Sequence, residues 1–308
     1  MQKKLIVASP RGFCAGVTRA VEVVQKALDL WGSPIYVKHE IVHNQFVVDQ
    51  LRDSGAVFVE ELEEVPAGSH VIFSAHGVPP SAFKEAKDRG LLVTDATCPL
   101  VTKVHKEARR YADQGCEILL IGHREHVEAI GTCGVAPKQT RIIQTREEAE
   151  AVEVTPQDAV AVLTQTTLSV DDAKEIQEVL QRRFGELKTP TRSDICYATT
   201  NRQTAIKEIC QEVELVLVVG SRTSSNSNRL CEVAKKAGVE AYLIGDETEI
   251  DPRWLNGVHA VGMTAGASTP EEIIERCIQR LGELGIASVQ EKEIVSEQVS
   301  FNLPQMTK

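Results

Sequence analysis

The chain has 308 residues, of which 42% are hydrophobic and 25% are charged, as in globular proteins rather than disordered or fibrous ones. At roughly 150 residues per domain, this length predicts about two domains and excludes a single small module held by disulfides. Its 34 basic and 44 acidic residues give a net charge of −10, which argues against general affinity for nucleic acid or anionic membranes.

The chain shows no sign of export or membrane insertion. No apolar run reaches the roughly 18 residues of a membrane span, and the first residues lack the apolar core of a signal peptide. The eight cysteines include no C-x-x-C pair, so we expect reduced thiols. We therefore expect a cytoplasmic protein.

A unit of about 90 residues repeats three times along the chain. The first repeat predicts a helix, three strands and a closing helix at Val17–Leu30, Ile35–Val37, Val57–Val59, Val71–Ser74 and Ser81–Arg89. The second predicts the same order at Val101–Ala112, Glu117–Ile121, Arg141–Gln144, Ala159–Leu163 and Val170–Phe184. The third predicts it again at Arg202–Val213, Leu215–Val219, Ala241–Ile244, Ala260–Thr264 and Pro270–Leu284.

Local signals support this pattern. Each repeat carries an acidic segment and a proline before its last strand, at Pro66, Pro156 and Pro252. Capping boxes are expected where Ser169 precedes Asp172 and where Thr269-Pro270 precedes Glu272. The weakest copies are the second helix of the second repeat, around 126–137, and the first strand of the third repeat, where 188–191 resembles a linker.

Strands that alternate with helices predict an α/β fold with mostly parallel sheets. We expect three similar small α/β domains, 1–90, 91–190 and 191–286, followed by a C-terminal tail, 287–308. In such sheets ligands bind beyond the carboxyl ends of the strands. A pseudo-threefold arrangement of the domains would bring those ends to one central cavity.

Polar residues follow equivalent strands in the three repeats. Each repeat also has a strand before its first helix, and Cys14, Cys98 and Cys196 follow that strand. After a further 28 or 29 residues come His43, His126 and the run Ser224-Ser225-Asn226, and after the last strands come His76, Thr166 and Ser268. The spacing predicts that all these side chains line the cavity.

Three thiolates suggest a metal site, and their softness narrows the metal to zinc, copper(I) or an iron–sulfur cluster. The short C-x₂₋₄-C spacing of structural zinc is missing. A cubane cluster ordinarily has four cysteine ligands, so three would leave one iron open to a substrate. The other five cysteines, at 116, 133, 210, 231 and 277, are expected to be structural.

The remaining residues suggest an anion pocket beside an acid. The Ser224–Asn228 run opens a helix after a strand, where free N–H groups and hydroxyls bind anions, although a plain helix cap is the alternative. With His43, His76 and Ser268 it predicts a diphosphate pocket that needs no lysine. Glu128 can deliver a proton if burial raises its pKa, and a solvated loop glutamate is the alternative.

At these residues the chain resembles the IspH (LytB) family, the 4-hydroxy-3-methylbut-2-enyl diphosphate reductases of the methylerythritol phosphate route to isoprenoids. The resemblance rests on eight segments in order: Pro10–Val17, His39–Asn44, Phe73–Val78, Asp95–Val101, Thr164–Ser169, Cys196–Gln203, Ser224–Asn228 and Thr264–Ser268.

The resemblance implies an oxidoreductase that removes the substrate's hydroxyl reductively and gives isopentenyl and dimethylallyl diphosphate. It implies a 4Fe-4S cluster on Cys14, Cys98 and Cys196 with one open iron. Glu128 would be the catalytic acid, and the electron donor would be a ferredoxin or flavodoxin. The substrate would contact eight residues: His43, His76, His126, Thr166, Ser224, Ser225, Asn226 and Ser268.

The chain departs from the family in one place, because His126-Val127-Glu128 stands where the family usually has His-Pro-Glu. Loss of the fixed φ of proline is expected to loosen the loop that aims Glu128. Two other functions remain open from the residues alone. One is a zinc-dependent hydrolase of a phosphorylated metabolite, and the other is a cluster-bearing redox or iron sensor without catalysis.

Overall fold

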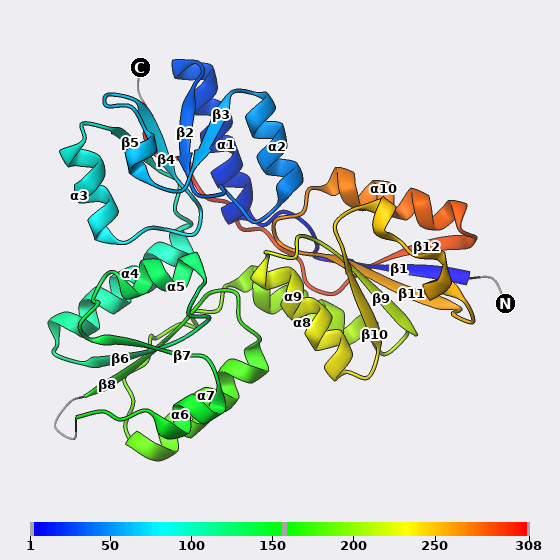
Figure 1. Ribbon diagram of the computed structural model, residues 1–308. Coiled ribbons are helices and arrows are strands. Elements are labelled where there is room, and N and C mark those ends of the chain that lie inside the picture. The colour runs from blue at the N-terminus through cyan, green and yellow to red at the C-terminus, as the bar shows by residue number, and fades with distance from the viewer. Residues whose placement is uncertain (1–2, 156–158, 307–308) are drawn as a thin grey trace. The chain divides into compact units, whose positions relative to one another are not determined.

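The computed structural model describes residues 3–155 and 159–306, so Pro156 of the second repeat lies outside the described residues. Figure 1 labels the helices and strands of the chain. The chain forms two compact units. The first comprises Met1–Val17, His43–Val47 and Tyr197–Ser300, and the second comprises Thr18–Val42, Val48–Cys196 and Phe301–Lys308. Among the described residues, no helix is both long and apolar enough to cross a membrane.

The first unit is built on a parallel five-stranded sheet of order β10-β9-β11-β1-β12. Its strands are β1 (Lys3–Ser9), β9 (Leu215–Val219), β10 (Glu240–Ile244), β11 (Ala260–Ala265) and β12 (Ile286–Glu293). Its helices are α8 (Tyr197–Ile209), α9 (Ser225–Lys236) and α10 (Glu271–Glu283), with short 3₁₀ turns η2 (Glu247–Glu249) and η3 (Pro252–Leu255).

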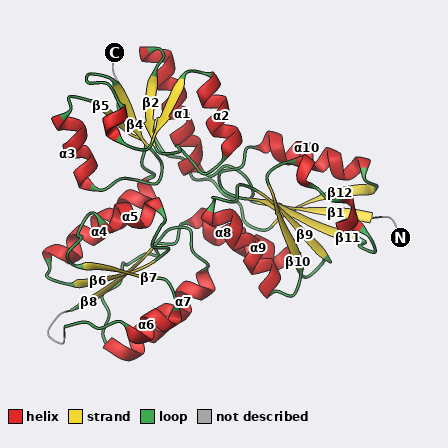
Figure 2. Ribbon diagram, viewed as in Figure 1, coloured by secondary structure: helices red, strands yellow, loops and turns green. Residues whose placement is uncertain are grey.

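Strand β1 is buried on both faces because its apolar side chains alternate between two hydrophobic clusters. Leu5 and Val7 pack in the cluster that contains Ile273 and Ile274 of α10. Ile6 and Ala8 pack in the opposite cluster with residues of α8 and α9. Helices therefore cover both faces of this sheet, as parallel sheets require (Figure 2).

The second unit contains two smaller parallel sheets. One has the order β3-β2-β4-β5, with β2 (Ile35–Lys38), β3 (Ala56–Val59), β4 (His70–Phe73) and β5 (Leu92–Asp95). The other has the order β7-β6-β8, with β6 (Glu117–Ile121), β7 (Thr140–Ile143) and β8 (Val160–Thr164).

Helices precede or follow these strands in chain order. The helices are α1 (Ala15–Trp31), α2 (Gln45–Asp53), η1 (Leu62–Glu64), α3 (Pro80–Asp88), α4 (Pro99–Asp113), α5 (Val127–Cys133), α6 (Arg146–Ala151) and α7 (Val170–Phe184).

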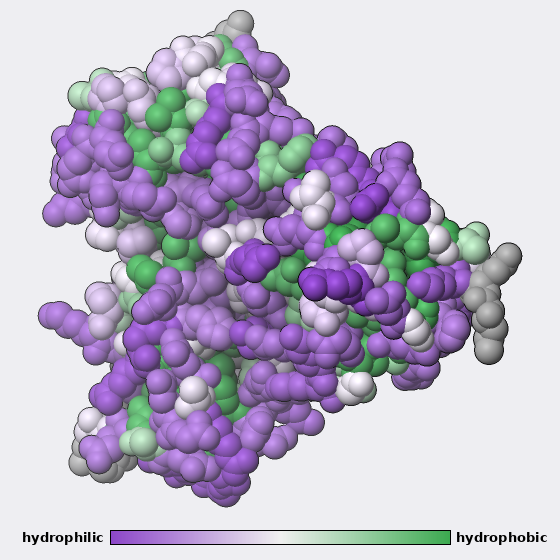
Figure 3. Space-filling view, turned by 45° about the vertical axis from the view of Figure 1, so that its right-hand side comes forward, coloured by the Kyte–Doolittle hydropathy of each residue, from purple (hydrophilic) through white to green (hydrophobic). Residues whose placement is uncertain are grey.

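The face of the molecule in Figure 3 is mainly hydrophilic, with smaller hydrophobic areas between the polar side chains.

Three parallel sheets with helices between their strands confirm the expected α/β class. The expected domain boundaries stay a prediction, and the strands group differently at two places. Strand β5 pairs with β4 although it lies beyond residue 90, and β1 pairs with β11 and β12.

Two local expectations are wrong. The segment treated as a tail begins with a strand, β12. Thr269 does not cap α10, because its hydroxyl donates to the Val219 carbonyl and Pro270 occupies the cap position. By contrast, the Ser169 side chain accepts from the Asp172 N–H, so the expected start of α7 with Ser169 as its N-cap is confirmed.

Candidate active site

Each cysteine singled out in the sequence directly precedes a helix. Cys14 lies before α1, Cys98 caps α4 and Cys196 lies before α8. Their backbone N–H groups donate to carbonyls two residues beyond the ends of β11, β4 and β8, namely those of Ala267, Ala75 and Thr166. The same anchor therefore occurs three times. Because a helix N-terminus favours negative charge, each position suits a thiolate.

The other cysteines make poorer ligands. Burial raises the pKa of Cys210 to about 11 and those of Cys231 and Cys277 to about 12, and it also raises the pKa of Cys133. Cys116 is fully buried in a hydrophobic cluster. Since a metal needs the thiolate form, the donor set of the described residues fits a group held by three cysteines.

In the first unit, the loop after β11 gathers one set of site residues. Ala267 accepts from the Cys14 N–H through its carbonyl. It also donates from its backbone N–H to Asn226 Oδ1 at 3.0 Å. The next residue, Ser268, donates from Oγ to the His43 carbonyl at 2.9 Å. The structure thus brings Cys14, His43, Asn226 and Ser268 together at the carboxyl end of this sheet.

Helix α9 supplies the serines of the same set. Ser224 caps the helix, and its hydroxyl accepts from the Ser227 N–H at 3.3 Å. Ser225 and Asn226 are the first residues of the helix. The start of a helix, with its N–H groups and the neighbouring hydroxyls, is an arrangement that binds anions.

A close approach between α9 and the strand ends fixes this helix start. A Cβ added to Gly266 would lie 2.0 Å from Ser227 Oγ, and one added to Gly220 would lie 2.2 Å from it. Both glycines follow strands of the first unit, β11 and β9. Only a residue without a side chain lets the helix start pack against these strand ends.

In the second unit, histidines lie beside one another at the ends of two sheets. The ring centroids of His76 and His126 are 6.2 Å apart, and those of His76 and His39 are 6.0 Å apart. His39 follows β2 directly and adopts a φ of 61°. Its Nδ1 lies 2.9 Å from Oε2 of Glu60. A positive φ is uncommon for residues other than glycine, so the backbone of His39 is strained.

A hydrogen bond fixes the tautomer of His126. Its Nδ1 accepts from the Glu128 N–H at 3.2 Å. Because a neutral imidazole carries its proton on the other nitrogen, Nε2 of His126 is a donor. His76 is held differently, with Nδ1 at 3.2 Å from Ser74 Oγ.

Glu128 is a buried acid and not a solvated loop residue, since only 3% of it is exposed. Its carboxylate accepts from the Thr166 N–H at 2.6 Å and from the Thr166 hydroxyl at 2.9 Å. Burial raises the pKa of Glu128 to about 7, although both bonds from Thr166 act to lower it. A carboxyl group with this pKa can hold and release a proton near neutrality.

The chain around Val127 has the regular geometry of a helix start. Val127 is the first residue of α5, where the N–H has no acceptor within the helix and proline brings only its fixed φ. Valine adopts the helical conformation there, and the preceding His126 has φ −79° and ψ 131°. Glu128 keeps both bonds to Thr166.

Two chains of contacts join the second unit's residues. The Cys98 N–H donates to Ala75, whose neighbour is His76, and the Cys196 N–H donates to Thr166, which holds Glu128. The His126 ring neighbours that of His76, and its Nδ1 accepts from the Glu128 N–H. The structure therefore brings six predicted site residues together here: Cys98, Cys196, His76, His126, Glu128 and Thr166.

Sequence reasoning missed several polar residues that hold these groups. The Tyr197 hydroxyl accepts from the Ala15 N–H, and burial raises the pKa of Tyr197 to about 12. Asn226 donates to the Thr199 hydroxyl at 3.4 Å. Asp194 is 6% exposed and pairs with Lys103, and burial raises its pKa against the effect of that ammonium. The only sequence signal was their place beside the cysteines.

Known proteins are similar to this chain over most of its length. The model of the LytB protein family matches residues 5–282. A 4-hydroxy-3-methylbut-2-enyl diphosphate reductase of Protochlamydia amoebophila is 55% identical over 98% of this chain and 96% of its own, and one of Acidothermus cellulolyticus is 54% identical over 98% and 89%.

Solved structures of diphosphate reductases are also similar to this chain. The E-1-hydroxy-2-methyl-but-2-enyl-4-diphosphate reductase of Plasmodium falciparum has a TM-score of 0.95 and 39% identity, covering 100% of this chain and 96% of its own. A structure of (E)-4-hydroxy-3-methyl-but-2-enyl diphosphate reductase, described as the terminal enzyme of the non-mevalonate pathway, has a TM-score of 0.64 and 33% identity, covering 91% and 99%.

Proposed function

This chain belongs to the LytB protein family, and from that premise we propose that it reduces 4-hydroxy-3-methylbut-2-enyl diphosphate to isopentenyl and dimethylallyl diphosphate. The reaction breaks the allylic C–O bond, takes up two electrons and two protons, and releases one water. It is the last step of the methylerythritol phosphate pathway. The observation that carries the proposal is Glu128, a buried acid of pKa about 7 whose partner Thr166 also anchors Cys196.

We propose that Cys14, Cys98 and Cys196 hold one 4Fe-4S cluster. Their repeated backbone anchor and their places before helices support this ligand set over the five remaining thiols. When bound, such a cluster supplies electrons one at a time and an iron without a protein ligand that can polarise the substrate's hydroxyl.

Glu128 supplies the proton that turns the hydroxyl into water. Its carboxyl group is protonated in a large fraction of molecules at neutral pH, because burial disfavours the charged form. The bonds from Thr166 fix both carboxyl oxygens, so the proton leaves from a defined position. The Nε2–H of His126 is a neighbouring donor that can hold the same hydroxyl.

The diphosphate is bound by hydroxyls, amides and histidines. Ser224, Ser225 and Asn226 form the start of α9, Ser268 bonds the backbone of His43, and His76 is held by Ser74. A charge-assisted hydrogen bond contributes roughly 1.5–3 kcal/mol, so a few of them hold a diphosphate firmly without a lysine. A chain with a net charge of −10 can thereby bind an anionic substrate.

Anaerobic analysis tests the ligand set. Wild-type protein is expected to contain about four irons and four sulfides per chain. Cys14→Ser, Cys98→Ser and Cys196→Ser should each lose the cluster, whereas Cys277→Ser, which alters a core thiol, should keep it. Full iron content in any of the first three would contradict its role as a ligand.

Turnover tests the reaction itself. The protein, reduced by dithionite and a viologen, should consume the hydroxylated allylic diphosphate. A colourless, active enzyme with stoichiometric zinc would establish the hydrolase instead, and a cluster-bearing protein without turnover would establish the sensor.

The physiological electron donor and the compartment belong to the same proposal. The sequence shows no nicotinamide-binding fingerprint, so a ferredoxin or flavodoxin is the expected donor. We propose a cytoplasmic location for the enzyme.

A further inference from the structure

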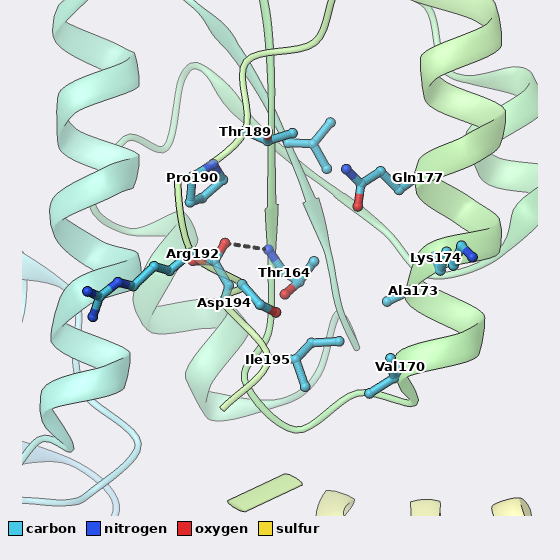
Figure 4. Close-up of a pocket in the computed structure, with 12 residues that line it drawn as sticks. Thr164, Val170, Ala173, Lys174, Gln177, Thr189, Pro190, Arg192, Asp194 and Ile195 are labelled. Atoms are coloured by element: carbon cyan, nitrogen blue, oxygen red, sulfur yellow. Dashed lines mark hydrogen bonds between the residues drawn. The ribbon is translucent and has the colours of Figure 1, made fainter. Parts of the chain in front are cut away.

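The segment that leads to Cys196 has little apolar packing of its own. Its residues 191–193 are exposed. Beside this segment lies an open pocket of about 250 Å³ (Figure 4). The segment, β8 and α7 line the pocket. Ile195 is the buried apolar residue of the segment, and it packs in a hydrophobic cluster with Ile176 and Leu180 of α7. Other contacts must therefore fix the position of the segment before Cys196.

Lys103 supplies those contacts from α4. Its Nζ donates to the carbonyls of Arg192 at 2.7 Å and Ser193 at 2.9 Å, and to Oδ1 of Asp194 at 3.0 Å. An ammonium group has three protons, so all of them are used on three consecutive residues. Cys98 caps the same helix, five residues before Lys103.

Asp194 extends the connection to β8. Its carboxylate, with a side chain that is 2% exposed, accepts from the Thr164 N–H at 3.2 Å (Figure 4). Thr164 ends β8, and two residues later Thr166 holds Glu128 and accepts from the Cys196 N–H. One ion pair thus joins the helix that Cys98 caps, the strand that leads to Thr166 and the segment that leads to Cys196.

We propose that Lys103 and Asp194 are positioning residues that hold the Cys196 segment at a fixed place relative to Cys98 and Thr166. The inference rests on the proposed cluster function and goes beyond it, because neither residue is among the proposed cluster ligands or substrate contacts. Groups that orient a metal ligand from outside the coordination shell commonly change metal affinity 10- to 100-fold when removed.

The pair does more than fill the interior. A lysine that only neutralised a buried carboxylate would need a single contact, whereas Lys103 also binds two backbone carbonyls of the segment. These backbone contacts act on the position of the chain, and Cys196 follows Asp194 by two residues.

The test compares Lys103→Met with Lys106→Met, a matched change at an exposed lysine of the same helix. In holoenzyme treated anaerobically with a chelator, Lys103→Met should lose iron about tenfold faster than wild type, and the electron paramagnetic resonance spectrum of its reduced cluster should shift. Lys106→Met should match wild type in both, and Lys103→Arg, which keeps the charge and the donors, should recover most of the lost half-life.

A second measurement needs no cluster. In cluster-free protein, hydrogen exchange of the amides in residues 192–196 should be about tenfold faster in Lys103→Met than in wild type, with exchange in β6 unchanged. If wild type itself binds no cluster, the proposed function fails, while this measurement still decides whether Lys103 fixes the segment.

Unchanged chelator kinetics and an unchanged spectrum in folded Lys103→Met would overturn the inference. The same holds if Lys106→Met loses iron as fast. Should Lys103→Met not fold, Asp194→Asn decides, because it keeps the side-chain volume but removes the charge. Faster iron loss in that variant supports the inference, and wild-type kinetics refute it.

Discussion

At the scale of single residues, the site depends on how burial and hydrogen bonds set the properties of individual side chains. Two opposing effects set the pKa of Glu128. Burial favours the neutral form of the carboxyl group, and the bonds from Thr166 favour its charged form. The result is a group that exchanges a proton near neutrality, as a general acid requires.

Replacing Glu128 with glutamine should slow turnover at least about a hundredfold, since the amide keeps the shape of the side chain and its oxygen can accept from the Thr166 N–H, but it carries no transferable proton. Iron and sulfide content should stay at wild-type levels. The control is Glu125→Gln, which alters an exposed glutamate three residues away and should leave turnover unchanged. Near-wild-type turnover of Glu128→Gln would remove the residue from the mechanism.

The same carboxyl group makes stability depend on pH. Its pKa is 4.5 in the reference state and about 7 in the folded chain, so between these values the folded chain holds a proton that the unfolded chain has released. The free energy of unfolding should therefore fall as pH rises through this window, by roughly 3 kcal/mol, and stay level above it. Urea unfolding of cluster-free wild type and Glu128→Gln at pH 5 and pH 8 measures this contribution. Equal pH dependence in the two proteins would contradict the assignment.

At the scale of elements, helix starts carry the site. The three cysteines precede α1, α4 and α8, Ser224 caps α9 and His126 caps α5. A helix start offers N–H groups without intrahelical partners and the positive end of the helix dipole. These elements therefore attract thiolates and phosphate oxygens by their backbones, before any particular side chain contributes.

Restoring the family residue at the start of α5 should be tolerated. Val127→Pro should raise the free energy of unfolding by about 0.4–1 kcal/mol, because the preceding residue is already extended and proline restricts the unfolded chain. Turnover and iron content should not change. Val127→Ala removes the same side chain without restricting φ, so it should show no such gain. A loss of activity in Val127→Pro alone would show that α5 must move.

The close approach of α9 to the strand ends gives a second prediction. Gly266→Ala should destabilise the protein by roughly 1–3 kcal/mol and raise the KM for substrate, because its Cβ would collide with Ser227 Oγ at the helix start. Ser227→Ala alone should be nearly neutral, since that hydroxyl makes no hydrogen bond among the described residues. The double variant should recover most of the loss. Equal damage in the single and double variants would refute the steric explanation.

At the scale of the whole molecule, segments far apart in the chain complete one another. Arg202 is fully buried and donates to the Gly12 carbonyl at 2.7 Å, to the Ala198 carbonyl at 3.0 Å and to Glu297 at 3.1 Å. One guanidinium thus joins residues from three distant parts of the first unit.

Breaking this pair should be costly. Glu297→Ala is expected to lower the free energy of unfolding by about 3 kcal/mol, because it leaves a buried guanidinium without its counter-charge. Adding Arg202→Met to Glu297→Ala should restore part of that loss by removing the charge. Urea unfolding of cluster-free protein measures both, and a double variant less stable than Glu297→Ala would contradict the expectation.

The sequence predicted most of what lies at strand ends. Strongly apolar strands such as β9 and β6 were evident, and the residues after them followed from the rule for parallel sheets. Strand β12 was missed because most of its residues are exposed and polar, so no apolar pattern marks it. Its pairing with β1 depends on backbone hydrogen bonds, which a side-chain pattern does not reveal.

The supporting contacts of the site were equally hidden. Lys103 and Asp194 are 91 residues apart, and each is an ordinary charged residue in the sequence. Thr269 stands where the sequence predicts the N-cap of α10, but its hydroxyl donates to the Val219 carbonyl instead. Competition between local and tertiary partners decides such cases.

The position of β1 has a consequence for how the protein is made. This strand lies between β11 and β12, so its partners are synthesised roughly 250 residues after it, and at 5–20 residues per second a ribosome needs on the order of 10–50 s to make them. The strands and helices between residues 18 and 196 emerge during that interval. The nascent chain must therefore keep its first apolar strand from aggregating while the second unit emerges, and Cys14 reaches its anchor only after Ala267 has been synthesised.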